Sequence, residues 1–350
     1  CKSKVAQNLK SPAKSILEIR QSLLACLWSV ADKTSVPELW QSLEDDIKKA
    51  KYPAYDEVKK ARGELNNYNN IKEMKDALRK NNVSGTMENF DISCVDNKPL
   101  DSALNNVDGR GVLTAQCNFL YGLCRQFSSL RAAVLSNHWE QLKDVSAIIK
   151  SKILDAKGVL VPNVPRVCLD EAQLCFIYSI DRLLITLMQE VLQDNAISGH
   201  LNDLKVTETS LKNIQEVISK AEETKCQSSE SIDLFKRCKS LFELRKSVDK
   251  LDWEQISKNL QLGPLKLLTG GELGYDELMT VRNAEEEHNV LLKLKSAINN
   301  GAPTKLENIE TTFLDCTTVN TEQLEMVIAF VSEVGCKTKE SETLKQLATY

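Results

Sequence analysis

The apolar residues of this chain recur at steps of three and four through long stretches, a spacing that predicts helices packed on one side. Residues 112–136 show the pattern most fully, with an apolar stripe that runs from Val112 to Leu135. Polar turn residues follow each such stretch and indicate where the helix ends. Five further long helices are predicted near 12–31, 54–80, 170–194, 230–251 and 275–299.

A shorter helix is predicted after several of these turns. Residues 139–153 and 253–262 both begin with tryptophan and continue with a helical pattern. Residues 37–51 begin with proline, which is favoured in the first helical turn, and 304–315 follow Pro303. The predicted unit is therefore a long helix, a tight turn and a shorter helix.

Part of the sequence occurs twice. Residues 124–142 align without a gap with residues 238–256, at an offset of 114 residues, and in both copies an arginine follows the central leucine. A second pair, 55–62 and 275–282, shares the letters YDE and aligns at an offset of 220. The structural repeat positions that we predict are Cys124, Leu130, Val134, Trp139, Cys238, Leu244, Val248 and Trp253.

Equivalent apolar positions recur along the whole chain, with anchors near residues 23, 74, 130, 187, 244 and 294 at spacings of 50–57 residues. A single helical hairpin cannot bury its apolar faces, whereas stacked hairpins share a continuous core. The sequence therefore predicts an all-α protein, an α-solenoid-like array of about six helical-hairpin repeats over residues 1–350. Residues 82–111, with several Asn, Asp and Gly, fit worst, and we expect an irregular loop or a domain break there.

The composition agrees with a soluble helical protein. Hydrophobic residues make up 42% and charged residues 27%, and with only 13 Gly and 8 Pro many short strands joined by tight turns are not expected. The most apolar stretch, 174–192, is interrupted by Asp181, Arg182 and Glu190, which suits a buried helix and predicts no membrane span. The chain opens without Met or a signal-peptide core, so we expect it to be a fragment or a processed piece.

The eleven cysteines are an odd number, contain no CxxC pair and lie mostly within apolar runs. This pattern predicts reduced, buried thiols and a reducing compartment such as the cytoplasm. The three histidines, His138, His200 and His288, share no ligand spacing with the cysteines, so neither a metal site nor a cofactor is predicted.

One segment resembles a reactive site in composition, because Cys124 and His138 occur in the same repeat. They are fourteen residues apart, about 20 Å along one helix, and the aligned copy has Asp252 where His138 stands. A catalytic pair is therefore not predicted, and we interpret His138 and Asp252 as turn or helix-capping residues.

Three other patterns have structural interpretations. The pairs Cys117/Cys124 and Cys168/Cys175 are seven residues apart, which suits core positions better than metal ligands on a helix. The GGELG segment at 270–274 lacks the order of a phosphate-binding loop. Glu285–Glu287 lie within a predicted helix with their side chains spread around its axis, so we expect a solvated face.

Charge is distributed unevenly along the chain. Residues 1–80 carry 16 Lys and Arg against 11 Asp and Glu, whereas residues 270–350 carry 7 against 14. This polarity could favour head-to-tail self-association or opposite partners at the two ends, although ordinary solvated helix faces are the favoured explanation. Basic and aromatic residues do not recur together, and the isoelectric point is near 5.7, so nucleic-acid binding is not expected.

These patterns predict a non-catalytic structural or scaffold protein that binds other proteins along a helical-repeat surface, as part of a larger cytoskeletal, ciliary or trafficking assembly. Two alternatives from other classes stay open. One is an RNA-binding helical solenoid. The other is a regulatory helical region of an enzyme whose catalytic domain lies outside this chain.

Overall fold

The computed structural model describes residues 55–111, 114–298, 321–335 and 338–349, together with Lys14 and Leu17. The described chain is mostly helical with a few short strands, which confirms the all-α class. Among its described helices none is both long enough and apolar enough to cross a membrane. The helices predicted at 37–51 and 304–315 lie outside the described residues, as does the one near 12–31 apart from the two isolated positions.

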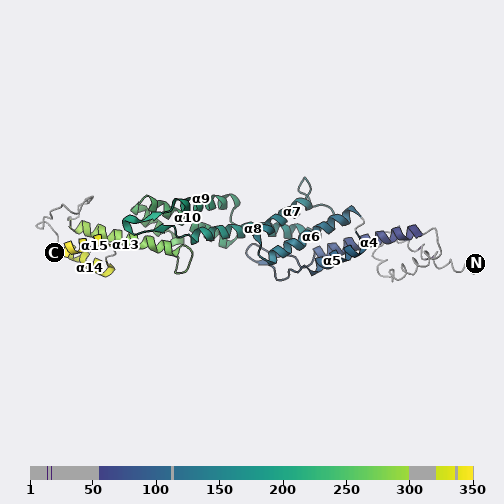
Figure 1. The fold of residues 1–350 in the computed structure, drawn as a ribbon, viewed down its shortest axis with the longest axis horizontal. Coiled ribbons are helices and arrows are strands. Elements are labelled where there is room, and N and C mark those ends of the chain that lie inside the picture. Colours follow the sequence, from purple (N-terminus) through teal and green to yellow (C-terminus); the bar gives the residue numbers. More distant parts are fainter. Residues whose placement is uncertain are drawn as a thin grey trace, which may run out of the picture. The chain divides into compact units, whose positions relative to one another are not determined.

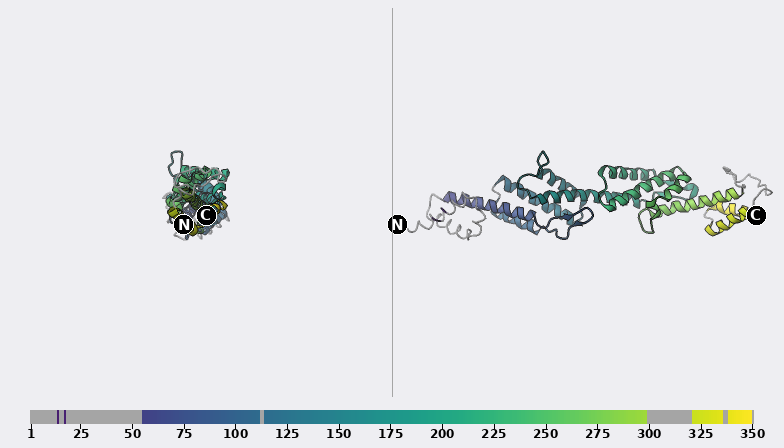
Figure 2. Two further views of the ribbon diagram at one scale, coloured as in Figure 1. Left: turned by 90° about the vertical axis from the view of Figure 1, so that its left-hand side faces the viewer. Right: turned by 180° about the vertical axis from the view of Figure 1, so that it is seen from behind.

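The chain divides into two compact units, residues 1–180 and 181–350, and the division falls within one long helix, α8 (Arg166–Gln193). In the first unit α4, α5 and α6 pack against one another and α7 packs against α6 (Figure 1; Figure 2). Besides the first part of α8, the described elements of this unit are α4 (Tyr55–Leu78), β1 (Ser84–Gly85), β2 (Phe90–Asp91), α5 (Lys98–Arg110), α6 (Ala115–Leu135) and α7 (Trp139–Ile153).

The second unit begins with the remainder of α8. Within it α10 packs against α9 and α11, and α13 packs against α11, α14 and α15. Its other described elements are β3 (Ile197–Ser198), the 3-10 turn η1 (Leu201–Asp203), β4 (Lys205–Val206), α9 (Glu208–Thr224), α10 (Ser229–Asp249), α11 (Trp253–Leu260), α12 (Gly263–Lys266), α13 (Tyr275–Ile298), α14 (Thr321–Val334) and α15 (Lys339–Thr349).

Each unit contains one small antiparallel hairpin, which follows a long helix. In β1–β2 Ser84 lies opposite Asp91, and in β3–β4 Ile197 lies opposite Val206. Gly85 and Gly199, which are 114 residues apart, have φ angles of 99° and 98°. A Cβ at either position would collide with a backbone carbonyl across the hairpin, so both turns need glycine. The range 82–111 thus holds the first hairpin and α5.

The structure does not confirm six equivalent hairpin repeats. The anchors Met74, Leu187 and Leu294 lie on α4, α8 and α13, whereas Leu130 and Leu244 lie on α6 and α10. Where the chain after them is described, α4 and α8 lead into a β-hairpin and a further helix, while α6 and α10 lead into a tight turn and a helix that starts with tryptophan. Because the two kinds of helix alternate, equivalent contacts recur only after 114 residues, which is about twice the predicted period. The contacts of Cys124 and Cys238 with the preceding long helix are an example.

The predicted repeat positions occupy the cores of the two units. Cys124 Sγ lies 3.9 Å from the carbonyl oxygen of Met74 on α4, and Cys238 Sγ lies 4.0 Å from that of Met188 on α8. The two tryptophans, Trp139 and Trp253, are partly buried against these cores. The other six predicted positions are each at most 1% exposed, namely Cys124, Leu130, Val134, Cys238, Leu244 and Val248.

Candidate functional site

The most unusual feature of the described residues is a fully buried arginine in each unit. Arg131 on α6 and Arg245 on α10 are 114 residues apart, and both side chains are 0% exposed. A buried guanidinium is costly unless a carboxylate and further hydrogen bonds compensate it. The partners of these two residues therefore define the polar chemistry of the interior.

Each arginine forms a two-point ion pair with a glutamate of the next long helix. Arg131 donates through Nε and Nη2 to Glu171 on α8, at 3.0 and 3.2 Å. Arg245 donates through the same two nitrogens to Glu277 on α13, at 2.8 and 2.7 Å. Burial raises the pKa of both carboxyl groups, and the arginine hydrogen bonds act in the opposite direction. The planar guanidinium matches a carboxylate in this geometry, so the pairs also fix helix orientation.

The same arginines also contact the end of the preceding long helix. Arg131 Nη2 donates to Asn82 Oδ1 at 3.0 Å, shortly after α4 ends. Arg245 Nη2 donates to the carbonyl oxygen of Asp194 at 2.7 Å, directly after α8 ends. We call each of these sets an arginine joint, because one side chain connects the end of one long helix to the beginning of the next.

The glutamates of the joints also bind the hairpin strands. The backbone N–H of Val83 donates to Glu171 Oε1 at 3.0 Å. The backbone N–H of Ile197, 114 residues later, hydrogen-bonds to Glu277 and opposes the rise in its pKa. The backbone contact of the glutamate therefore recurs in both joints.

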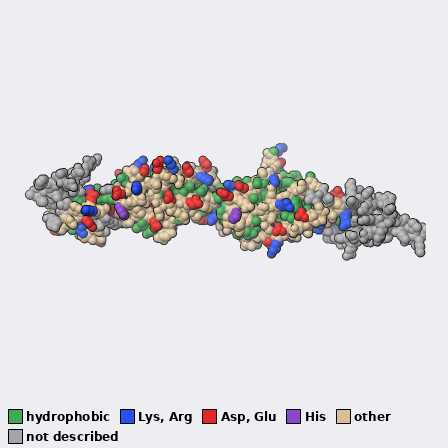
Figure 3. All heavy atoms as spheres, in the orientation of Figure 1, with side chains coloured by type: hydrophobic (Ala, Val, Ile, Leu, Met, Phe, Trp, Pro, Cys, Tyr) green, Lys and Arg blue, Asp and Glu red, His purple; other side chains and the backbone are tan. Residues whose placement is uncertain are grey.

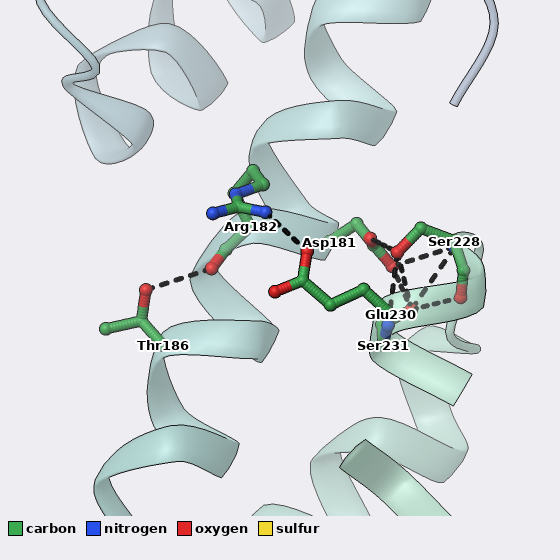
Figure 4. Close-up of polar contacts among 6 residues, drawn as sticks. All are labelled: Asp181, Arg182, Thr186, Ser228, Glu230 and Ser231. Carbon is green, nitrogen blue, oxygen red and sulfur yellow. Dashed lines mark hydrogen bonds and ion pairs between the residues drawn. The ribbon is translucent and has the colours of Figure 1, made fainter. Parts of the chain in front are cut away.

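A second polar cluster surrounds the beginning of α10 (Figure 4). Asp181 on α8 is 2% exposed and accepts hydrogen bonds from Ser228 Oγ at 2.5 Å and Ser231 Oγ at 2.7 Å. Ser228 Oγ in turn accepts from the backbone N–H of Ser231, a capping box that pairs otherwise free helix donors. Arg182 and Glu230 form an ion pair of 2.8 Å beside this cluster.

Related caps occur at the beginnings of α6 and α15. Thr114 Oγ1 donates to Asn67 Oδ1 on α4 at 2.9 Å, and Thr338 Oγ1 donates to Glu287 Oε1 on α13 at 2.7 Å. With the Ser228 cluster, a hydroxyl at a helix start binds a long helix in three places. We call these three sets cap joints. The acceptor is a neutral amide in the first and a carboxyl group in the other two.

Glu287 corrects one prediction from the sequence. Glu285–Glu287 were expected to form a solvated face, but Glu287 is 3% exposed, because it points to the beginning of α15. Consecutive helix positions face different directions, so one member of an acidic run can be buried while its neighbours are not. Glu286, for example, is exposed.

The tryptophans that begin α7 and α11 pack against different aromatic partners. Trp139 meets Tyr178 edge to face at 5.6 Å, and Tyr178 stacks on Phe90 of β2 at 3.7 Å. Trp253 stacks on His288 of α13 at 4.3 Å. Burial, and then the charge of Lys295, lower the pKa of His288, so the stacked imidazole is favoured in its neutral form.

The two turn residues before these tryptophans also differ. The Asp252 side chain accepts a hydrogen bond from the backbone N–H of Gln255 at 3.1 Å and caps α11. His138 makes no such side-chain cap at α7, so the predicted capping role applies only to Asp252. A short carboxylate reaches the first-turn donors, and aspartate is among the preferred capping residues.

The candidate nucleophile Cys124 lies in the hydrophobic core. Burial raises the pKa of the Cys124, Cys168 and Cys238 thiols to about 12. Since the thiolate is the reactive species, these cysteines are space-filling core residues at neutral pH. In the part of the chain that the structure describes, no group of three His, Cys, Asp or Glu residues is placed to hold a metal ion.

The surface features are shallow and polar. On the face drawn in Figure 3, side chains of both charges are interspersed. On α9, Lys212, Glu216 and Lys220 line an open hollow. In the 270–274 loop the carboxylate of Glu272 accepts from Thr269 and Arg237, which lower its pKa. A carboxylate in this loop would repel a phosphate or another anion.

No protein-family model, curated protein or solved structure matches this chain. The joints were not predicted from the sequence although part of their signal was present. Both arginines belonged to the aligned copies and Glu277 to one of the YDE segments, whereas Glu171 belonged to neither alignment. A sequence offset shows that two charged residues recur, but their burial depends on helices that lie far apart in the chain.

Proposed function

We propose that this chain is a non-catalytic structural or scaffold protein that binds other proteins along its helical surface. The observation that carries the proposal is the recurrence of the arginine joint, with Arg131–Glu171 in one unit and Arg245–Glu277 in the other. A catalytic centre has little reason to occur twice, whereas every unit of an array needs the same tie between neighbouring helices. In this proposal the two buried ion pairs connect neighbouring helices and have no catalytic role.

We further propose a helical-repeat array of the α-solenoid type. Its unit would be about 114 residues, with a long helix, a β-hairpin and a helix, then a second long helix, a turn and a tryptophan-led helix. In such arrays each unit mainly contacts its neighbours and presents an extended surface to partners. A cytoplasmic, reducing location suits the buried free thiols, and a cytoskeletal, ciliary or trafficking assembly suits an extended scaffold.

Exposed apolar side chains are the places where we expect partners to bind. Leu267 after α12 is 78% exposed, and Val159 in the loop before α8 is 59% exposed. Single exposed apolar residues are common on protein surfaces, but a binding surface needs some of them at its centre. These two positions belong to different units and can be tested separately.

The experiment is affinity capture from the native cell with quantitative mass spectrometry, using the wild-type chain and the variants Val159→Glu and Leu267→Glu. We expect defined protein partners, some of which are lost with one variant. Ser219→Glu adds the same charge to the polar face of α9 and is the matched control, which should retain all partners. Absence of protein partners together with turnover of a small molecule would contradict the proposal.

The unequal charges of the chain ends support a more specific proposal, head-to-tail self-association through the basic N-terminal and acidic C-terminal regions. Sedimentation at low and high salt measures it. A larger species that dissociates as salt is added is expected, and a monomer at every salt concentration would exclude it. A salt-sensitive shift with RNA instead of proteins would favour the alternative RNA-binding function.

A further inference from the structure

The two arginine joints differ most clearly at the Nη1 atom of the guanidinium. Arg245 Nη1 donates to Ser210 Oγ of α9 at 2.6 Å. Arg131 Nη1 is buried, and among the described residues no atom accepts a hydrogen bond from it. Because both guanidinium groups use Nε and Nη2 for their glutamate, we expect Nη1 to point toward the equivalent place in the two units.

In the first unit that place is the beginning of α5. The 114-residue offset aligns Asp96 with Ser210 and Asn97 with Leu211, whereas counting from the N-caps Asn97 and Thr207 places the buried, apolar Leu100 opposite Ser210. Asp96 is turned outward, with its side chain 41% exposed and its Oδ1 accepting from the backbone N–H of Lys98 at 2.9 Å. Asp96 therefore does not accept a hydrogen bond from Arg131 as Ser210 does from Arg245.

Asn97 leaves a buried acceptor close to the same helix turn. Its Nδ2 donates to the carbonyl oxygen of Ser128 at 3.0 Å, and Ser128 precedes Arg131 by one turn of α6. Its Oδ1 is buried, and no donor reaches it from the described part of the chain. Helices α5 and α6 pack against each other (Figure 1). If Arg131 Nη1 points to this interface, as the second unit leads us to expect, the unpaired donor and the unpaired acceptor face the same place.

Buried polar atoms are almost always hydrogen-bonded, to protein or to an ordered water molecule. The charge of Arg131 is already balanced by Glu171, so a neutral ligand suits the place better than an anion. Water can accept from Nη1 and donate to Oδ1, and two to four polar partners are usual for an internal water. We propose that a buried water molecule bridges Arg131 Nη1 and Asn97 Oδ1, and performs in the first unit the role that the Ser210 hydroxyl performs in the second.

A crystal structure of the full chain that resolves ordered water tests the proposal directly. We expect a water at hydrogen-bonding distance, about 2.7–3.2 Å, from both Arg131 Nη1 and Asn97 Oδ1. An Asp96 carboxylate or any other protein atom bonded to Nη1 would overturn it. An interface with no water between the two atoms would overturn it as well.

A solution measurement uses Arg245 as an internal control. In NMR spectra of arginine-labelled protein, we expect the Arg131 guanidinium to show a cross-peak to a long-lived water and Arg245 to show none. The double variant D96S/N97L gives the first unit the two residues of the second, and it should remove that cross-peak. A wild-type chain without the cross-peak, or a folded variant that keeps it, would contradict the proposal.

Discussion

Arg131 and Arg245 occupy equivalent positions, but the second is the more completely bonded. Both pair with a glutamate of the next long helix, yet only Arg245 also donates to the Ser210 hydroxyl and to the carbonyl oxygens of Val191 and Asp194. The ion pair is common to the two units, while the remaining hydrogen bonds come from neighbouring residues that differ. The ion pair can therefore be kept in different surroundings, and we expect the two joints to differ in strength.

The largest expected effect is loss of a joint arginine. Arg245→Met leaves Glu277 buried without its partner, which should lower the free energy of unfolding by about 3–5 kcal/mol. Arg131→Met should cost less, because Arg131 makes fewer hydrogen bonds. Urea unfolding of both variants measures the difference.

The control for this prediction removes both charges of one joint. Replacing a buried ion pair by apolar residues of similar volume is often neutral, so R245M/E277L should recover most of the stability lost in R245M. If the single variants cost less than about 1 kcal/mol, the joints would contribute little to stability, because a buried charge left unpaired is expected to cost several times more.

The tryptophans test whether the two copies are equivalent in packing. Trp139→Ala and Trp253→Ala should each reduce the free energy of unfolding by about 3 kcal/mol, near the lower limit for large aromatic residues, because both side chains are partly buried. Thermal and urea unfolding measure this, and the corresponding Phe variants should lose less. Two near-neutral Ala substitutions would contradict the alignment of the copies.

The cap joints should give a smaller difference. Ser228→Ala removes a hydroxyl that donates to the Asp181 carboxyl group, and Thr114→Ala removes one that donates to the Asn67 amide. Loss of a helix cap costs about 1 kcal/mol, and hydrogen bonds to charged groups are stronger, so S228A should be the more destabilising. Equal losses would show that the charge of the acceptor does not matter, and unfolding of D181N provides an independent check.

The smallest expected effect is a pH dependence confined to the second unit. The pKa of His288 is lowered in the folded protein, so its stabilising contribution is present above its ordinary value of 6.5 and is lost as pH falls through the folded pKa. Unfolding of wild type and His288→Gln between pH 5 and 8 measures it, and the variant should lose less stability on acidification. An identical pH dependence in the two proteins would show that His288 does not contribute. Glu171 and Glu277 cannot account for a loss on acidification, because their raised pKa values make stability fall as pH rises through them.

Much of the fold was predictable because it depends on neighbouring residues. The helix predicted at 139–153 is α7 (Trp139–Ile153), and α10 and α13 begin and end within about two residues of their predictions. The hydrophobic period, the turn residues and the tryptophans are local signals. The β-hairpins were not predicted, since each strand has only two residues and carries no period of its own.

The candidate site was less predictable than the helices. Asp181 stood out in the sequence only as an interruption of an apolar stretch, and its role depends on Ser228, 47 residues later. The six-unit interpretation treated all anchors as one kind, because the spacing between alternating helices is nearly even. The two kinds of helix differ in the β-hairpin that follows and in their buried contacts. The spacing of the anchors in the sequence shows neither of these features.

The sequence by itself determined the helical class, the positions of most described helices and the 114-residue offset, because periodicity and self-similarity are properties of the linear chain. Only the tertiary structure decided which charges are buried. Arg131 pairs with Glu171, 40 residues later in the chain, and Arg245 pairs with Glu277, 32 residues later. In the sequence alone, these two arginines cannot be distinguished from the basic residues that are exposed. The free energy of a charged side chain depends on whether packed helices remove it from water and supply a partner, and that is decided only when distant helices come together.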